Sequence, residues 1–255
     1  MRTASLTRSI VAPVLFGVLF LALWQLAVTG LEIKPSVVPG PSAIGEEFVT
    51  NLGTVLKGAA VTGGNALVGL VVGFVIGVVL AVLAALARVV DELAAPIVAG
   101  LAVVPIVALA PVLYTMYGAN AETARQLIAA IAVFIPVYIN TVRGLRQVRP
   151  VHRDLMRAYA ASAWQVTRTV TLPGALPYLF TGLRIASSLS VISALVAEYF
   201  GGPVSGLGRS ITTAASSSNY PLAWAYVLGA ILLGLVFYSV TLGLEKLASR
   251  RSGTP

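Results

Sequence analysis

Few residues in this chain could carry out chemistry, because only 10% of its 255 residues are charged and none is cysteine. His152 is the sole histidine, and a lone histidine beside arginines is far more often a solvated surface residue than a base or a metal ligand. The nine acidic residues are scattered, with no HExxH motif and no pair of catalytic carboxylates. A GxxxxGK[ST] phosphate loop is also absent. The sequence therefore argues against an enzyme, and against a metal or nucleotide site in this chain.

Two ionisable residues nevertheless stand inside an apolar stretch. Arg184 and Glu198 are fourteen positions apart, about 21 Å along a helix, so they cannot pair directly within one helix. A charge within a membrane is costly and indicates function by default, although a group near a helix end can also reach water. We expect Glu198 at a gate or a subunit contact, and Arg184 as an anchor at the cytoplasmic side.

The most polar stretch is RDLMRAYAASAWQVTRTVTLP, from Arg153 to Pro173. Apolar residues recur in it at helical spacing and predict one apolar stripe, made of Leu155, Tyr159, Ala163, Val166 and Val170. Arg157 and Arg168 would share another face. The pattern favours an amphipathic segment of two short helices that Pro173 and Pro177 end. Such a segment could rest on anionic lipid or dock onto a protein.

The elements around this stretch are long and apolar. Hydrophobic residues make up 58% of the chain, and about 20 consecutive apolar residues let a helix cross a bilayer. We predict an all-α polytopic membrane protein whose six transmembrane helices, in one domain, cover about 10–29, 66–87, 93–117, 124–142, 177–200 and 223–247. The first is too long for the apolar core of a signal peptide, so we interpret it as an uncleaved span.

The basic residues that give the net charge of +8 are distributed as the topology of such a protein predicts. With both termini cytoplasmic, the basic residues expected outside are only Lys34, Lys57, Arg125 and Arg209. This is the bias of basic residues toward the cytoplasm, so no nucleic acid is needed to explain the charge. It places the loop 143–176 between the fourth and fifth spans in the cytoplasm.

Small residues and prolines mark two of the spans. Gly69, Gly73 and Gly77 share a helix face and predict an internal packing seam rather than a dimer contact. Pro105 and Pro111 interrupt the third span, which makes it a candidate liner of the transport pathway. Tyr114 near its outer end could touch a ligand or anchor the helix at the membrane interface.

DLMRAYAASAWQVTRTVTLP resembles the cytoplasmic loop of permease subunits in binding-protein-dependent ABC importers. The signature of that loop is Glu-Ala-Ala, three residues, Gly, nine residues, Ile, one residue and Leu-Pro. Alignment on Leu172 and Pro173 matches this signature to Asp154, Leu155, Met156, Ala160 and Val170. Trp164 and Gln165 stand where the nitrate/sulfonate/taurine branch commonly has Trp-Gln. LPGALPYLFTGLRIASSLSVISALVAEYFGG, SGLGRSI and VPIVALAPVLYTMYG are similar to the same branch, so the likeness covers roughly residues 60–248.

The resemblance implies a transmembrane subunit of an ATP-driven importer in the bacterial inner membrane. A cytosolic ATPase dimer would use the ATP and Mg²⁺, while this chain would bind no cofactor. Other partners would be a second permease, of the same or a related chain, and an extracytoplasmic binding protein. The residues implied in coupling to the ATPase are Asp154, Leu155, Met156, Arg157, Ala158, Tyr159, Ala160 and Ala161.

The chain departs from the family pattern at its two alanines and at its glycine. Leu155 and Met156 resemble permeases for thiamine pyrimidine precursors or riboflavin, which favours a small polar or heteroaromatic solute. Ala160 replaces the glycine, and the bend between the two short helices depends on whether alanine can adopt it. The alternative function is an ion-coupled secondary transporter or a channel subunit. Such carriers usually hold carboxylates near the midplane of the membrane, and only Glu198 is available for this role, toward one end of its span.

Overall fold

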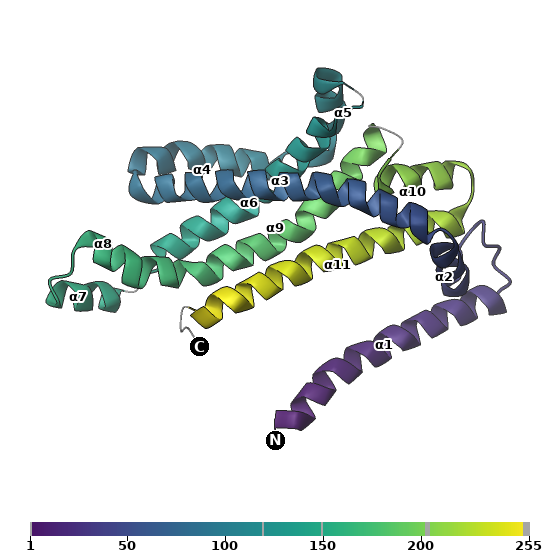
Figure 1. Ribbon diagram of the computed structural model, residues 1–255, viewed down its shortest axis with the longest axis horizontal. Coiled ribbons are helices and arrows are strands. Elements are labelled where there is room, and N and C mark those ends of the chain that lie inside the picture. The colour runs from purple at the N-terminus through teal and green to yellow at the C-terminus, as the bar shows by residue number, and fades with distance from the viewer. Residues whose placement is uncertain (1, 119, 149, 202–204, 252–255) are drawn as a thin grey trace.

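The computed structural model describes residues 2–118, 120–148, 150–201 and 205–251, and every regular element in these ranges is a helix (Figure 1). In chain order the helices are α1 Arg2–Gly30, α2 Pro41–Thr50, α3 Leu52–Leu86, α4 Arg88–Val103, α5 Ile106–Tyr117, α6 Glu122–Arg146, α7 Pro150–Ala158, α8 Ala163–Val166, a π-helical turn η1 Thr167–Thr171, α9 Leu172–Phe200, α10 Leu207–Ser216 and α11 Tyr220–Arg251. The all-α prediction is confirmed.

Five helices of the described chain are long and apolar enough to cross a membrane, and a sixth span results if the bent pair α4 and α5 is counted as one. The six predicted spans are therefore present only if α4 and α5 together count as one span. The axes of α4 and α5 differ by 103°, and Val104 and Pro105 lie at the break. Val104 is extended because the ring of the following proline disfavours the helical conformation before it. Pro105 thus interrupts the third span, as expected, whereas Pro111 lies inside α5 and does not interrupt it.

The second span is longer than the sequence predicts. The predicted span covers 66–87, but residues 52–65 are part of the same helix, α3. The separate helix of this region is α2, which starts at Pro41 after the proline-rich loop. Proline suits the first turn of a helix, because its missing N–H would have no partner there.

The centre of the bundle is the packing of α3 against α6 and of α6 against α9. A side chain at Gly69 or Gly73 would collide with the backbone of α6, and one at Gly77 would press on Val137. On α9, Gly182 approaches the carbonyl of Pro136 in the same way. The predicted glycine seam is confirmed as an internal contact, and it lets these three helices lie very close together.

Ion pairs join the helices at the end of the bundle where α7 and α8 lie. Arg146 of α6 lies 2.8 Å from Asp91 of α4 and donates to the carbonyl of Ala84 in α3 over 3.2 Å. Arg184 of α9 pairs with Glu245 of α11. Arg184 therefore has a partner in another span, while its predicted role as a cytoplasmic anchor stays a prediction.

The first span, α1, stands apart from the other spans (Figure 1). Its side chains from Val11 onward are mostly exposed. It is held near its C-terminal end, where Trp24 makes an edge contact with Trp224 of α11, with ring centroids 5.9 Å apart. The Gln25 side chain also accepts a hydrogen bond from the backbone N–H of Ser42 in α2.

Pro173 and Pro177 do not end the amphipathic segment, which corrects the sequence-based expectation. Helical structure continues from Ala163 to Phe200 through the π turn. In that turn the N–H of Leu172 donates to the carbonyl of Thr167, five residues back, instead of the usual four. Pro173 has no N–H to donate, and the wider turn before it accommodates the missing bond. We call residues 163–200 the α8–α9 rod.

Candidate functional site

The site that the sequence singles out is a projecting arm made of α7 and the turn that leads to α8, residues 150–162. In Figure 1 the arm lies at one tip of the molecule, beyond the ends of the spans. On it, Val151, Leu155 and Tyr159 follow one another at four-residue spacing and are 72%, 53% and 76% exposed. Met156 is half-buried. The arm therefore presents a row of apolar side chains that the described part of the chain leaves uncovered.

The turn at the end of α7 keeps its shape although alanine has replaced the glycine of the family loop. Ala160 has a φ of 48°, in the left-handed region. Its N–H donates to the carbonyl of Arg157, and the N–H of Ala161 donates to that of Met156. These bonds form a Schellman motif, in which the left-handed position normally favours glycine. The bend is thus present, and Ala160 adopts it at a conformational cost of about 1–2 kcal/mol.

The next helix begins at once, because Ser162 caps α8. Its hydroxyl oxygen accepts from the backbone N–H of Gln165, and the Gln165 side chain accepts from the N–H of Ser162 over 2.7 Å. This reciprocal pair is a capping box. It gives the glutamine of the Trp-Gln pair a structural role, while Trp164 beside it is 66% exposed.

The reversal at residues 159–162 corrects the predicted stripe. Two short helices are present, as expected, but they do not continue one another. Leu155 and Tyr159 belong to the arm, whereas Val166 and Val170 belong to the half-buried side of the rod. One stripe along both helices is therefore wrong, and Arg157 and Arg168 share no helix face. Arg157 instead pairs with Asp154 within the arm, over 3.4 Å.

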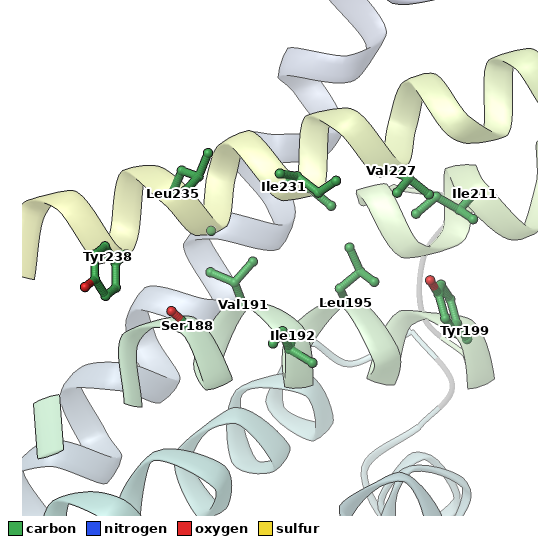
Figure 2. Close-up of a pocket in the computed structure, with 12 residues that line it drawn as sticks. Ser188, Val191, Ile192, Leu195, Tyr199, Ile211, Val227, Ile231, Leu235 and Tyr238 are labelled. Carbon is green, nitrogen blue, oxygen red and sulfur yellow. The ribbon is translucent and has the colours of Figure 1, made fainter. Parts of the chain in front are cut away.

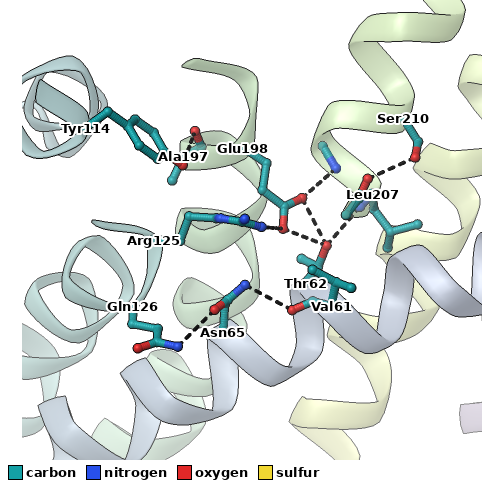
Figure 3. Close-up of polar contacts among 12 residues, drawn as sticks. Val61, Thr62, Asn65, Tyr114, Arg125, Gln126, Ala197, Glu198, Leu207 and Ser210 are labelled. Atoms are coloured by element: carbon teal, nitrogen blue, oxygen red, sulfur yellow. Dashed lines mark hydrogen bonds and ion pairs between the residues drawn. The ribbon is translucent and has the colours of Figure 1, made fainter. Parts of the chain in front are cut away.

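A second group of polar residues (Figure 3) lies around the start of α10, at the end of the bundle opposite to the arm (Figure 1). Glu198 near the end of α9 is fully buried, and its carboxylate accepts a hydrogen bond from the N–H of Gly208 at 2.8 Å. The hydroxyl of Thr62 in α3 lies 3.0 Å from both carboxylate oxygens. The same hydroxyl accepts from the N–H of Leu207 at 2.9 Å. The first backbone N–H groups of α10 are thus held by α3 and α9.

The cation of this group is Arg125 of α6, whose Nη1 lies 3.3 Å from Oε1 of Glu198. Both side chains are buried, at 0% and 1% exposure, and among the residues that the structure describes Nε and Nη2 of Arg125 have no hydrogen-bond partner. Gly206 has a φ of 117°, and a Cβ there would lie 2.5 Å from the Glu198 carboxylate. We call Thr62, Arg125, Glu198, Leu207 and Gly208 the Glu198 cluster.

Sequence reasoning missed this cluster, because Arg125 was assigned to the outer surface on topology alone. The available signal was that Arg125 and Glu198 stand at corresponding ends of two predicted spans. Nearby, the amide of Gln126 donates to the Asn65 side chain at 3.0 Å and adds a second polar link between α6 and α3. Glu198 contacts its own chain on all these sides, and its expected place at a gate or a subunit contact stays a prediction.

Comparison with known proteins identifies the family. The model of the binding-protein-dependent transport system inner membrane component matches residues 73–253. This chain belongs to that family. The permease is 36% identical to the riboflavin transport system permease protein RibX of Chloroflexus aurantiacus, over 91% of this chain and 87% of the relative. It is 34% identical to the putative aliphatic sulfonates transport permease protein SsuC of Escherichia coli, over 74% and 72%.

Other relatives point to the same branch and the same fold. The formylaminopyrimidine transport permease protein ThiX of Halalkalibacterium halodurans is 26% identical over 92% of this chain and 93% of its own. A crystal structure of an amino acid ABC transporter with histidines matches with a TM-score of 0.62 and 18% identity, over 80% of this chain and 96% of that one. The permease is thus a non-catalytic transport subunit of the nitrate/sulfonate/taurine branch, in the inner membrane.

The residues predicted to line a pathway in this permease fall into two settings. Pro105 and Pro111 are exposed, the first at the break between α4 and α5. Tyr114 is buried, and its hydroxyl donates to the carbonyl of Ala197 in α9 over 3.2 Å. The ring therefore ties α5 to α9. Contact between any of these residues and a transported solute stays a prediction.

The structure also contains a groove of about 540 Å³ between α9 and α11 (Figure 2). Ile211 of α10 and Tyr199 lie at one end of it, and Tyr238 at the other. Apart from Ser188, Tyr199 and Tyr238, its labelled walls are aliphatic. Such a lining offers few hydrogen bonds to a polar solute, so the groove by itself does not define a substrate site.

Proposed function

We propose that this permease, together with a second permease subunit, forms the translocation path of an importer driven by a separate ATPase dimer. An extracytoplasmic binding protein delivers the solute to the end where α10 lies. The arm of residues 150–162 contacts the ATPase in the cytoplasm. Both termini are cytoplasmic, with α4 and α5 together counted as one span, which agrees with the distribution of basic residues.

The observation that carries this proposal is the uncovered apolar row of Val151, Leu155 and Tyr159 on the arm. An amphipathic helix that lays such a row into a groove of its partner is a common mode of recognition. The charged side chains of Asp154 and Arg157 are exposed beside the row and would meet polar groups at the rim of the groove. The row also lies within the segment that resembles the coupling loop of the family.

The rod explains how docking at the arm could move the transport path. Helical structure continues without a break from α8 through η1 to the end of α9. When the ATPase subunits close around ATP, the arm and the rod move together and change the path from outward-open to inward-open. ATP and Mg²⁺ bind to the ATPase, and this chain supplies the mechanical connection.

We propose a small heteroaromatic solute as the substrate. Leu155 and Met156 in the arm resemble the subgroup that transports riboflavin or thiamine pyrimidine precursors, and two similar permeases carry the names of riboflavin and formylaminopyrimidine systems. The path runs between the two permease subunits, beside the break at Pro105. Ligand screening of the binding protein that accompanies this permease tests this assignment, and a preference for sulfonates would contradict it.

Affinity purification tests the docking assignment. In mild detergent, the tagged permease should co-purify with its ATPase, and Leu155→Asp should abolish this because it places a charge in the apolar row. Val49→Asp is the matched control, because Val49 is also an exposed apolar residue, at 73% against 53% for Leu155, and lies in α2 at the other end of the bundle. Retention of the ATPase by the Leu155→Asp variant would contradict docking through the arm.

A further inference from the structure

The Glu198 cluster fixes the position of α10 through the backbone of its first turn. Leu207 and Gly208 donate their N–H groups to Thr62 and Glu198, at 2.9 and 2.8 Å. The first N–H groups of a helix have no partner within the helix and carry partial positive charge, so a buried carboxylate is a strong partner for them. Leu207 itself is fully buried. The start of α10 is therefore locked in both its polar and its apolar contacts.

The opposite face of α10 is exposed and contributes nothing to this lock. Arg209, Thr213 and Ser216 point away from the core, whereas Leu207, Gly208 and Ala214 are buried. α10 is thus a short amphipathic helix at the end of the bundle that faces away from the arm (Figure 1). Its buried face packs against α11 and α3, and the carboxylate of Glu198 joins it to the last turn of α9.

The Arg125–Glu198 pair does not have the geometry of a contact that mainly adds stability. One nitrogen of the guanidinium lies 3.3 Å from the carboxylate, and the other two nitrogens are buried without a partner in the described part of the chain. A buried ion pair is favourable only when its geometry is good and its remaining groups are satisfied, and replacing it with apolar residues often leaves stability unchanged. The carboxylate, by contrast, is well satisfied by Thr62 and Gly208. These contacts of the carboxylate therefore fix the orientation of α10.

We propose that Glu198 and Thr62 are positioning residues that fix α10 to the end of the α8–α9 rod, so that a displacement of α10 reaches the arm at the other end. The inference rests on the proposed function, since it gives α10 the task of passing the arrival of the binding protein to the ATPase. Neither residue touches the solute. Arg125 pairs with the Glu198 carboxylate from α6.

Thr62→Val is the sharpest test, because valine has nearly the shape of threonine but can neither donate to Glu198 nor accept from Leu207. The chain has no cysteine, so Thr213→Cys gives a unique site for a spin label on the exposed face of α10. In the complete transporter in nanodiscs, we expect Thr62→Val to increase the mobility of this label. The concentration of ligand-loaded binding protein that half-stimulates ATP hydrolysis should rise about fivefold or more, the scale set by the loss of buried hydrogen bonds. Basal hydrolysis should stay unchanged.

Matched variants separate positioning from general damage. Thr62→Ser keeps the hydroxyl and should restore both the label mobility and the stimulation. The double variant Arg125→Met, Glu198→Leu removes both charges and leaves no unpaired one, so it should fold while showing the same defect as Thr62→Val. Unchanged label mobility and unchanged stimulation in the Thr62→Val variant would overturn the proposal, whatever the double variant does.

The unsubstituted, labelled complex distinguishes failure of this inference from failure of the proposed function. If it recruits no ATPase, or shows no stimulation by the binding protein, the proposed function fails and the signalling role of α10 fails with it. If it is stimulated normally and Thr62→Val is stimulated equally well, only the positioning role is wrong.

Discussion

The two ends of the permease contain the same kind of ion pair in opposite surroundings. Arg125 and Glu198 are 0% and 1% exposed, while Arg157 and Asp154 are 81% and 69% exposed. The buried pair joins α6 to α9 and adjoins the start of α10, whereas the exposed pair joins residues three positions apart in one short helix. Both pairs join an arginine to a carboxylate, so burial makes the difference. The buried pair holds helices of this chain together, and the exposed pair is accessible to a partner.

The largest effect on stability is expected at the buried end. Glu198→Ala leaves the buried guanidinium of Arg125 without its counter-charge and should destabilise the permease by about 3–5 kcal/mol, as breaking a buried pair does. Thermal unfolding in a mild detergent measures the loss. Asp154→Ala is the control, and its unfolding temperature should match that of the parent. Equal losses in both variants would remove the distinction between the two ends.

The largest effect on function without loss of stability is expected at the arm. Tyr159 is the most exposed side chain of the row. Tyr159→Asp should uncouple ATP hydrolysis from uptake, while the unfolding temperature stays as in the parent. Tyr159→Phe keeps the ring and should transport normally. The measurement is solute taken up per ATP hydrolysed in proteoliposomes. Normal coupling in the Asp variant would show that the row is not a docking surface.

An intermediate effect is expected at the turn of the arm. Ala160→Gly relieves the left-handed strain and should stabilise the turn by about 1 kcal/mol. Hydrogen exchange at the N–H of Ala161, which donates to Met156, reports the change as slower exchange. The neighbouring substitution Ala158→Gly, inside α7, should speed exchange instead, because glycine weakens a helix. The same sign of change for both variants would exclude strain at Ala160.

The smallest effect is expected for the exposed pair itself. A double-mutant cycle of Asp154→Ala and Arg157→Ala should give a coupling energy of no more than about 0.5 kcal/mol, the value typical of exposed pairs on a helix. Thermal unfolding of the four proteins measures it. A coupling energy near that of a buried pair would mean that the arm folds back onto the bundle in solution.

Some features that local sequence determines were predicted correctly, although the apolar stripe of the loop and the end of its helix at Pro173 were not. The apolar runs gave the helices, the four-residue spacing of Gly69, Gly73 and Gly77 gave the packing seam, and Pro105 marked the break in the third span. Each of these depends on residues that are neighbours along the chain or on one helix face. The arm was singled out through a long spaced motif rather than through any single residue, and its docking role stays a prediction.

The features that depend on distant residues were not predicted. Arg125 and Glu198 are 73 positions apart, and nothing in either neighbourhood indicates which charge faces which. The helix α10 was not foreseen, because its start is defined by contacts with Thr62 and Glu198 rather than by a capping side chain of its own. At Ala160 the residue type favours a helix, and the surrounding hydrogen bonds impose a turn instead.

The π turn at Thr167–Thr171 determines the direction in which the arm points around the axis of the rod. One inserted residue rotates everything on its N-terminal side by about 100° relative to a regular α-helix, since each residue of an α-helix turns by that angle. The direction in which Leu155 and Tyr159 face therefore depends on a single residue of helical register. Deleting Thr169 would aim the arm at a different side of the bundle while leaving every residue of the arm unchanged.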